Sequence, residues 1–173
     1  MNTSEAQLIE EEHFNTDSEQ FLTFMLAGEE YGVEILRVQG VQGWTKTTPI
    51  PNTPDYILGV INLRGAIVPI IDLRTRFGLE TISYGSTTVV VVVKITSEDL
   101  ERTVGVVVDG VSEVYRLDNK DIQASPEFGD AVKTEFIKGL ATADEKMIIL
   151  LEINKLISFE EISEVVIQEE VNT

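Results

Sequence analysis

Apolar residues in this chain recur with a period of two or in short unbroken runs, a pattern typical of β-strands. Six such runs are bounded by turn-forming residues, at 21–26, 31–35, 87–93, 103–108, 111–115 and 147–153. Further apolar runs lie between residues 57 and 74. Together they indicate about eight to ten short strands and few helices. The pattern therefore predicts an all-β barrel or sandwich.

Some segments predict more specific structure. The unbroken valine run at 89–93 has no polar face, so it predicts a strand covered on both sides. Asp109-Gly110 stands between two apolar runs and predicts a hairpin turn. Residues 35, 38 and 41 are apolar at a spacing of three, which predicts a short helical turn. Ser158 and Glu161 have the spacing of a capping box, so a C-terminal helix should follow.

The segment from Gly59 to Arg74 is the most informative part of the chain. Two apolar runs flank a compact turn in which Asn62 and Gly65 are turn formers. The turn holds the Arg64 guanidinium at a fixed place on a rigid sheet. Because no catalytic partner is near in the sequence, this arrangement indicates recognition of another molecule rather than chemistry.

The charge is concentrated at the two ends. The chain has 173 residues and a formal net charge of −17. Residues 1–20 hold six acidic residues and residues 158–173 hold five, and neither segment contains lysine or arginine. We expect an acidic disordered tail over 1–18 and order from about residue 19. Without a basic surface, neither nucleic acid nor an anionic membrane is an expected partner.

Several classes of protein are excluded or disfavoured by composition. The chain has no cysteine, which rules out disulfides and thiolate catalysis. The first residues lack the basic and apolar regions of a secretory signal. The longest unbroken apolar run, at 89–93, is too short to span a bilayer. These features predict a soluble cytoplasmic protein.

Candidate catalytic groups are few. The single histidine, His13, lies in the acidic tail, so a Ser-His-Asp triad is not expected. Asp72 and Asp109 both end apolar runs and leave open a hydrolase that uses them as an acid pair. A local turn hydrogen bond or ion pair is the simpler role for each. We expect no catalytic residue, metal or cofactor; a small-ligand binder is a further alternative.

Three blocks of sequence resemble the CheW family of chemotaxis coupling proteins. The first block runs from residue 21 to 39 and contains Glu30-Tyr31-Gly32-Val33-Glu34-Ile35; the second runs from 52 to 74 and contains Asn62-Leu63-Arg64-Gly65. The third, residues 104–114, contains Val108-Asp109-Gly110. The resemblance covers residues 19–157 and implies two interlocked five-stranded SH3-like barrels, followed by a C-terminal helix and acidic tail over 158–173.

The resemblance also implies a function. It implies a non-enzymatic adaptor that couples the helical hairpin at the cytoplasmic tip of methyl-accepting chemoreceptors to the regulatory domain of the histidine kinase CheA, in arrays at the inner membrane. Receptor- or kinase-binding positions carried over from the family are Val38, Gly40, Gly59, Arg64, Val111 and Val114. The family commonly has glutamate where this chain has Gly40. A CheW-like scaffold of a non-chemotactic array is the alternative within the family.

Overall fold

Ten strands form two five-stranded sheets in the computed structural model, which describes residues 18–124 and 134–172. The first sheet has the order β8 (Gly110–Asp118), β1 (Ser18–Leu26), β2 (Glu29–Glu34), β10 (Lys146–Leu151), β9 (Ile137–Ala143). The second has the order β3 (Val38–Gly43), β6 (Val89–Ser97), β7 (Leu100–Val108), β5 (Ala66–Asp72), β4 (Ile57–Leu63). The all-β architecture of two five-stranded units predicted from the sequence is confirmed.

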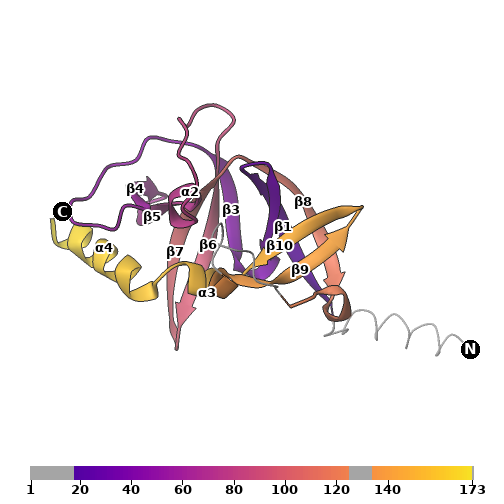
Figure 1. Cartoon of the computed structure of the whole chain (residues 1–173). Coiled ribbons are helices and arrows are strands. Elements are labelled where there is room, and N and C mark those ends of the chain that lie inside the picture. Colours follow the sequence, from indigo (N-terminus) through magenta and orange to yellow (C-terminus); the bar gives the residue numbers. More distant parts are fainter. Residues whose placement is uncertain (1–17, 125–133, 173) are drawn as a thin grey trace, which may run out of the picture.

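The two sheets are interlocked through the order of the chain. The second sheet is built from one continuous segment, whereas the first combines β1 and β2 with strands from the other end of the chain. In Figure 1 the indigo β1 accordingly lies among the orange strands of the first sheet. Each sheet contains one parallel pair of strands that are not consecutive in the chain. The pair is β2 with β10 in the first sheet and β5 with β7 in the second.

The predicted hairpin at Asp109-Gly110 is wrong. β7 already pairs with β6 and β5, and β8 pairs with β1 in the other sheet, so the chain crosses between sheets at this point. Gly110 does not have the positive φ that a tight hairpin would need. The Asp109 carboxylate instead accepts a hydrogen bond from the Ala27 amide at 2.9 Å. The Asp-Gly signal is local, so it could not show that both edges of β7 are already paired, with β6 and with β5.

The predicted helical turn after residue 34 is only partly present. A 3₁₀ turn, η1, covers Ile35–Arg37, and the chain then becomes β3, whose residues alternate in exposure. β3 pairs with the valine-rich β6, opposite Val89–Val93. Long-range pairing therefore overrode a weak helical period. β6 itself is buried on both faces, as the valine run predicted.

The two halves contain a repeat that is hard to see in the sequence. β4 and β9 have bounds that differ by 80 in residue number, and so do the short helices α2 (Leu73–Arg76) and α3 (Ile153–Leu156). The pairing registers agree as well, with Leu63 opposite Ala66 in one hairpin and Ala143 opposite Lys146 in the other. The hairpins β4–β5 and β9–β10 are thus structural equivalents with few identical residues.

Three hydrophobic clusters hold this arrangement together. The largest packs between the sheets and extends to helix α4 (Phe159–Asn172), through Ile162, Val165 and Val166. A second cluster, around Phe21 and Ile148, lies on the other face of the first sheet. A third, around Val68 and Val92, lies on the corresponding face of the second sheet. The predicted C-terminal helix is present, and its first turn is capped by Ser158, whose hydroxyl accepts from the Glu161 amide at 3.3 Å.

Arg76 contacts equivalent positions in the two halves of the repeat. Its guanidinium lies 4.8 Å from the ring centre of Tyr56 and 4.4 Å from that of Phe136, which are equivalent positions in the two halves. Its Nε donates to the Leu156 carbonyl at 2.8 Å. Burial lowers the pKa of the guanidinium. Tyr56 in turn donates to the Glu161 carboxylate, which ties α4 to the same point.

The remaining elements are short. They are the 3₁₀ turns η2 (Asn119–Asp121) and η3 (Thr134–Phe136). Within the described residues, no helix has the length and apolar character needed to cross a membrane. The predicted tail over 1–18, including His13, lies almost wholly outside the described residues, and the domain limits drawn from the sequence stay predictions.

Candidate protein-interaction site

The β4–β5 hairpin presents Arg64 at its tip. Leu63 pairs with Ala66, so Arg64 and Gly65 form a two-residue loop, and both have positive φ, at 53° and 87°. These angles belong to the type I′ turn, whose twist matches that of the flanking strands. The Asn62 side chain accepts a hydrogen bond from the Gly65 amide at 2.9 Å. The sequence signal at Asn62 and Gly65 is therefore realised as a rigid turn.

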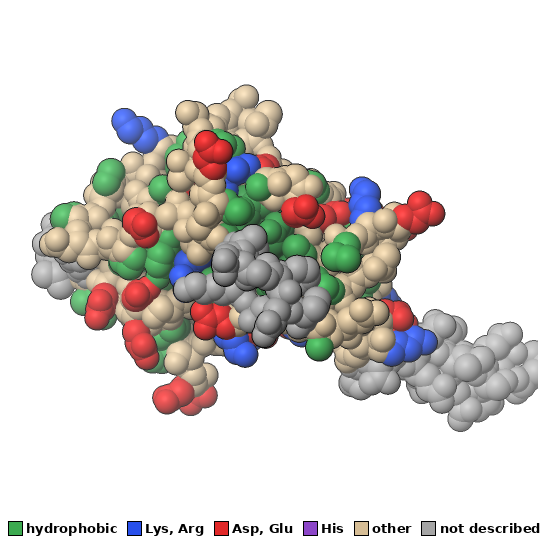
Figure 2. Space-filling view, in the orientation of Figure 1, with side chains coloured by type: hydrophobic (Ala, Val, Ile, Leu, Met, Phe, Trp, Pro, Cys, Tyr) green, Lys and Arg blue, Asp and Glu red, His purple; other side chains and the backbone are tan. Residues whose placement is uncertain are grey.

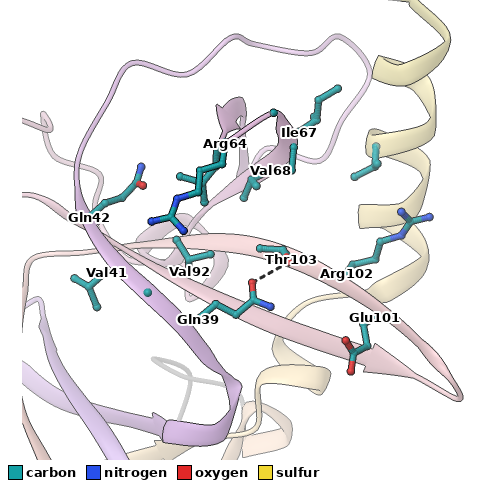
Figure 3. A pocket seen from close by; sticks show the side chains of 15 residues that line it. Gln39, Val41, Gln42, Arg64, Ile67, Val68, Val92, Glu101, Arg102 and Thr103 are labelled. Atoms are coloured by element: carbon teal, nitrogen blue, oxygen red, sulfur yellow. Dashed lines mark hydrogen bonds between the residues drawn. The ribbon is translucent and has the colours of Figure 1, made fainter.

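The Arg64 side chain is exposed and borders a cavity of about 640 Å³. Figure 3 shows its guanidinium pointing across the cavity toward Gln42 and Val92, away from its own hairpin. It takes part in no hydrogen bond or ion pair with any other described residue. The cation is therefore available to a partner, since solvent alone satisfies its five donors.

The walls of this cavity come from five strands and one helix. Strand β3 contributes one wall, β6 and β7 the floor, and α4 reaches it through Val166. Gln39 and Thr103 are joined across the floor by a hydrogen bond of 3.0 Å, as Figure 3 shows. At the far end the Arg102 Nε donates to the Ser163 hydroxyl at 3.4 Å. The lining is mixed polar and apolar, which suits a protein surface better than a buried cofactor.

Gly40 faces the same cavity as Arg64. A side chain at position 40 would meet no atom within 4 Å of its Cβ, so the glycine leaves open space beside the guanidinium. The structure thus brings together two of the six residues expected to bind partners. Val38, at the start of β3, is half-buried and packs against the main core.

Gly59 lies beneath the site rather than in it. Its φ is +143°, and a Cβ built there would be 2.3 Å from the Thr48 carbonyl oxygen. Thr48 and Val60 exchange backbone hydrogen bonds of 2.9 Å at this point. Gly59 therefore permits the close approach of two backbones that sets the base of the hairpin.

Val111 and Val114 lie on the other sheet, on its edge strand β8. Val111 is half-buried against the main core, and Val114 is 47% exposed. The structure does not place them at the Arg64 cavity. The six predicted positions therefore divide between the cavity, the supporting core and a separate edge strand.

Two exposed apolar residues were missed by the reasoning from sequence. Leu36 in η1 is 86% exposed, and Val41 in β3 is 48% exposed beside Gly40. Val41 belonged to the predicted helical stripe of residues 35, 38 and 41, so only the observed pairing of β3 shows that it faces outward. Trp44 packs against Tyr84 with ring centres 5.0 Å apart.

Asp72 and Asp109, the acid pair considered for hydrolysis, both have structural roles. Asp72 is buried and caps α2, since its Oδ1 accepts from the amides of Arg74 and Thr75 at 3.0 and 3.4 Å. Asp109 forms an ion pair of 2.6 Å with the Arg74 guanidinium. Both carboxylates are thus engaged within the fold, and the hydrolase alternative is not supported.

Figure 2 shows one face of the molecule, on which acidic and basic side chains are scattered singly among other residues. No group of three or more histidine or acidic residues able to hold a metal ion occurs within residues 18–124 and 134–172.

Comparison with known proteins gives a consistent result. The family described as CheW-like domain matches residues 20–161. "Chemotaxis protein CheW" of Klebsiella aerogenes is 48% identical over 148 residues, covering 86% of this chain and 87% of that protein. "Chemotaxis protein CheW" of Rhizobium meliloti is 34% identical over 149 residues, covering 86% and 94%. "Protein FrzA" of Myxococcus xanthus is 30% identical over 141 residues, covering 80% and 85%.

A solved structure agrees with the fold. The crystal structure of the scaffolding protein TtCheW from Thermoanaerobacter tengcongensis superposes with a TM-score of 0.73 at 35% identity. It covers 83% of this chain and 94% of that chain.

Proposed function

This chain belongs to the CheW-like family, and on that premise we propose that it is an adaptor of bacterial chemotaxis that couples methyl-accepting chemoreceptors to the histidine kinase CheA. Its relatives are chemotaxis proteins named CheW, and its structural neighbour is a scaffolding protein. It acts by binding, without bond-making chemistry, in receptor arrays at the inner membrane.

The observation that carries this proposal is the free Arg64 guanidinium at a rigid hairpin tip. Arginine is favoured at the centres of interfaces because its planar head makes several directed hydrogen bonds. Here it stands over a cavity whose walls are partly apolar and partly polar, which suits the side chains of an amphipathic helix lying across it. We assign receptor or kinase binding to Val38, Gly40, Arg64, Val111 and Val114, with Gly59 supporting the hairpin.

Coupling requires that these contacts differ between signalling states. A ligand shifts a kinase equilibrium only through differential affinity for its states. Modest interfaces on two separate surfaces suit this role, since repetition in an array strengthens each contact through avidity. The edge strand β8 with Val114 offers the second surface, apart from the Arg64 cavity.

Arg64→Ala tests the proposal directly. We expect binding to the receptor cytoplasmic fragment or to CheA to weaken by about 1–3 kcal/mol, roughly 5- to 150-fold, as for an interface anchor. Co-sedimentation and a pull-down with each purified partner would measure it. Lys120→Ala removes one exposed positive charge from the other half and should bind like the wild type. A folded Arg64→Ala protein with unchanged binding to both partners would refute the proposal.

The alternative within the family is a CheW-like scaffold of a non-chemotactic array, and one relative, Protein FrzA, is not named as a chemotaxis protein. Its 30% identity is well below the 48% of the relative from Klebsiella aerogenes, which favours chemotaxis. Identification of the bound receptor and kinase would separate the two readings.

A further inference from the structure

Acidic groups gather at one end of the first sheet. Along β2, Tyr31 and Val33 face the main core, so Glu30 faces the opposite side together with Gly32. Glu30 stands opposite Ile148 of β10, a member of the cluster on that side. We call this group of residues, Glu30, Glu113, Tyr115 and Asp144, the acidic mouth.

The other members of the acidic mouth lie on or beside the same face of the first sheet. Glu113 is fixed through its backbone, which exchanges hydrogen bonds of 2.9 and 3.2 Å with the Thr23 hydroxyl. Tyr115 and Ala143 pack against the cluster on this face, and Asp144 follows Ala143 at the tip of the β9–β10 hairpin. Burial, then the direct interaction of the hydroxyl with the Glu113 carboxylate, and then the charges of Asp144 and Glu30 raise the pKa of the Tyr115 hydroxyl to about 12.

Glu30 is the unusual member of the group. Its side chain is only 6% exposed, and its Oε1 is fully buried without a hydrogen-bond partner among the described residues. A carboxylate held in this way is costly, because desolvation is not offset by a donor. A side chain kept at such a cost indicates a ligand that supplies the missing donors.

No cation of the described chain fills that role. None of the ion pairs among the described residues includes Glu30, Glu113 or Asp144. Lys138 on the same sheet is committed to Glu19 and Glu34, at 3.0 and 2.5 Å. The acceptors of the acidic mouth are therefore unmatched within the fold.

The internal repeat sharpens the contrast. Gly105 lies opposite Ile70 in one half, and Gly32 lies opposite the equivalent residue Leu150 in the other. Thr103 and Glu30, each two residues before its glycine, therefore occupy equivalent positions. Thr103 is satisfied by Gln39, whereas Glu30 is not satisfied. The hairpin tip beside Thr103 carries Arg64, and the tip on the side of Glu30 carries Asp144. The same scaffold thus carries a basic hairpin tip in one half and an acidic tip in the other.

We propose that the acidic mouth is a second protein-docking site, which receives an arginine side chain of a partner protein. A guanidinium can give parallel hydrogen bonds to the buried Glu30 carboxylate and stack on the ring of Tyr115. Glu113 and Asp144, both exposed, supply attraction at the rim. A metal ion is the less suitable occupant, since these residues form no metal-holding group in the described chain.

Glu30→Gln tests this site with simple probes. The full-length protein, labelled with ¹⁵N, is titrated with N-acetyl-arginine amide and, separately, with N-acetyl-citrulline amide, which has the same shape without the charge. We expect the arginine probe to shift the amide signals of Glu30, Tyr115 and Asp144 saturably, and the citrulline probe to leave them unchanged. In Glu30→Gln, the affinity for the arginine probe should fall at least tenfold.

Thermal unfolding separates a binding role from a structural one. If Glu30 is kept for a ligand, its neutral replacement should raise the melting temperature, by about 2–4 °C for a chain of this size. Glu80→Gln, which neutralises an exposed acid away from both sites, serves as the matched control and should change neither binding nor melting.

Four results would overturn the proposal. One is an equal response to the citrulline probe, and another is a Glu30→Gln protein that binds the arginine probe as well as the wild type does. The third is a lower melting temperature for Glu30→Gln, which would assign Glu30 to the folding of the sheet. Shifts at the same signals with CaCl₂ but not with the arginine probe would assign the mouth to a metal ion, and this too would refute it.

Discussion

The hairpins β4–β5 and β9–β10 share one backbone and differ in what they carry. Both have a glycine near the start of the first strand, Gly59 or Gly139, and both end in a two-residue loop with positive φ at each position. One loop is Arg64-Gly65 and the other Asp144-Glu145. The fold therefore determines where each hairpin tip lies, and the two loop residues determine its charge.

The supporting contacts of the hairpins also differ in detail. At each base the glycine lies against a neighbouring backbone, that of Thr48 in one half and that of Gln123 in the other. The helix that follows is capped by the Asp72 side chain in one half, whereas Glu152 forms no such cap in the other. Each of these pairs gives a matched experiment in which one half serves as the control for the other.

The largest effect should come from the two glycines. Gly59→Ala places a Cβ 2.3 Å from the Thr48 oxygen at a φ of +143°, so we expect a loss of about 3–5 kcal/mol of unfolding free energy. Gly139→Ala meets a movable Ile122 methyl at 2.6 Å and the Gln123 oxygen at 2.8 Å, and should cost less. Urea denaturation of both variants would measure the difference. Gly59→Asp should be at least as harmful as Gly59→Ala, and equal stability of the two alanine variants would contradict this account.

Arg76→Ala tests the joint between the halves. It removes two ring contacts and a hydrogen bond to the Leu156 carbonyl, so we expect a loss of about 2–4 kcal/mol. Arg76→Lys keeps the charge but not the planar head and should recover only part of this. Chemical denaturation measures both. Full recovery by lysine would show that charge alone, and not stacking, holds the joint.

The helix caps should differ by a smaller amount. Asp72→Ala removes the acceptor for two amides of α2 and should cost about 1–2 kcal/mol, whereas Glu152→Ala should cost less than about 0.5 kcal/mol. Thermal unfolding of the two single variants would suffice. A larger loss for Glu152→Ala would mean that α3 depends on a contact of Glu152 other than capping.

The smallest effect concerns the loops themselves. Glu145 has a φ of 65° without being glycine, so Glu145→Gly should stabilise the protein by about 0.5–1 kcal/mol. The reverse change, Gly65→Glu, should destabilise it by a similar amount. Differential scanning calorimetry of both variants would check the signs. A stabilising Gly65→Glu would show that the two loops are not conformational equivalents.

Much of this protein could be predicted from residues that act locally. Alternating and continuous apolar runs predicted the strands, the turn residues Asn62 and Gly65 predicted the Arg64 tip, and Ser158 with Glu161 predicted the start of α4. In each case the deciding interactions are a few residues apart. The β9 strand was missed because its segment, from Ile137 to Ala143, has weak alternation and little β-branched character.

The candidate site was predictable only in part. Arg64 could be singled out because its turn signal is local, but the position of Gly40 across the same cavity depends on the pairing of β3 with β6. Gly59 was expected at the surface and lies at the base of the hairpin, where Thr48 approaches it. No local signal predicted Glu30, since an acidic residue beside a turn is ordinarily solvated.

The all-β architecture, the rigid arginine-bearing turn and the helix at the end of the chain follow from neighbouring residues, because strand period, turn geometry and capping are short-range effects. The change of sheets at Asp109, the equivalence of the two hairpins and the burial of one carboxylate oxygen without a donor are visible in the folded molecule alone. Those outcomes depend on which strand edges are already occupied and on what lies across a sheet. Both are set by residues far apart along the chain.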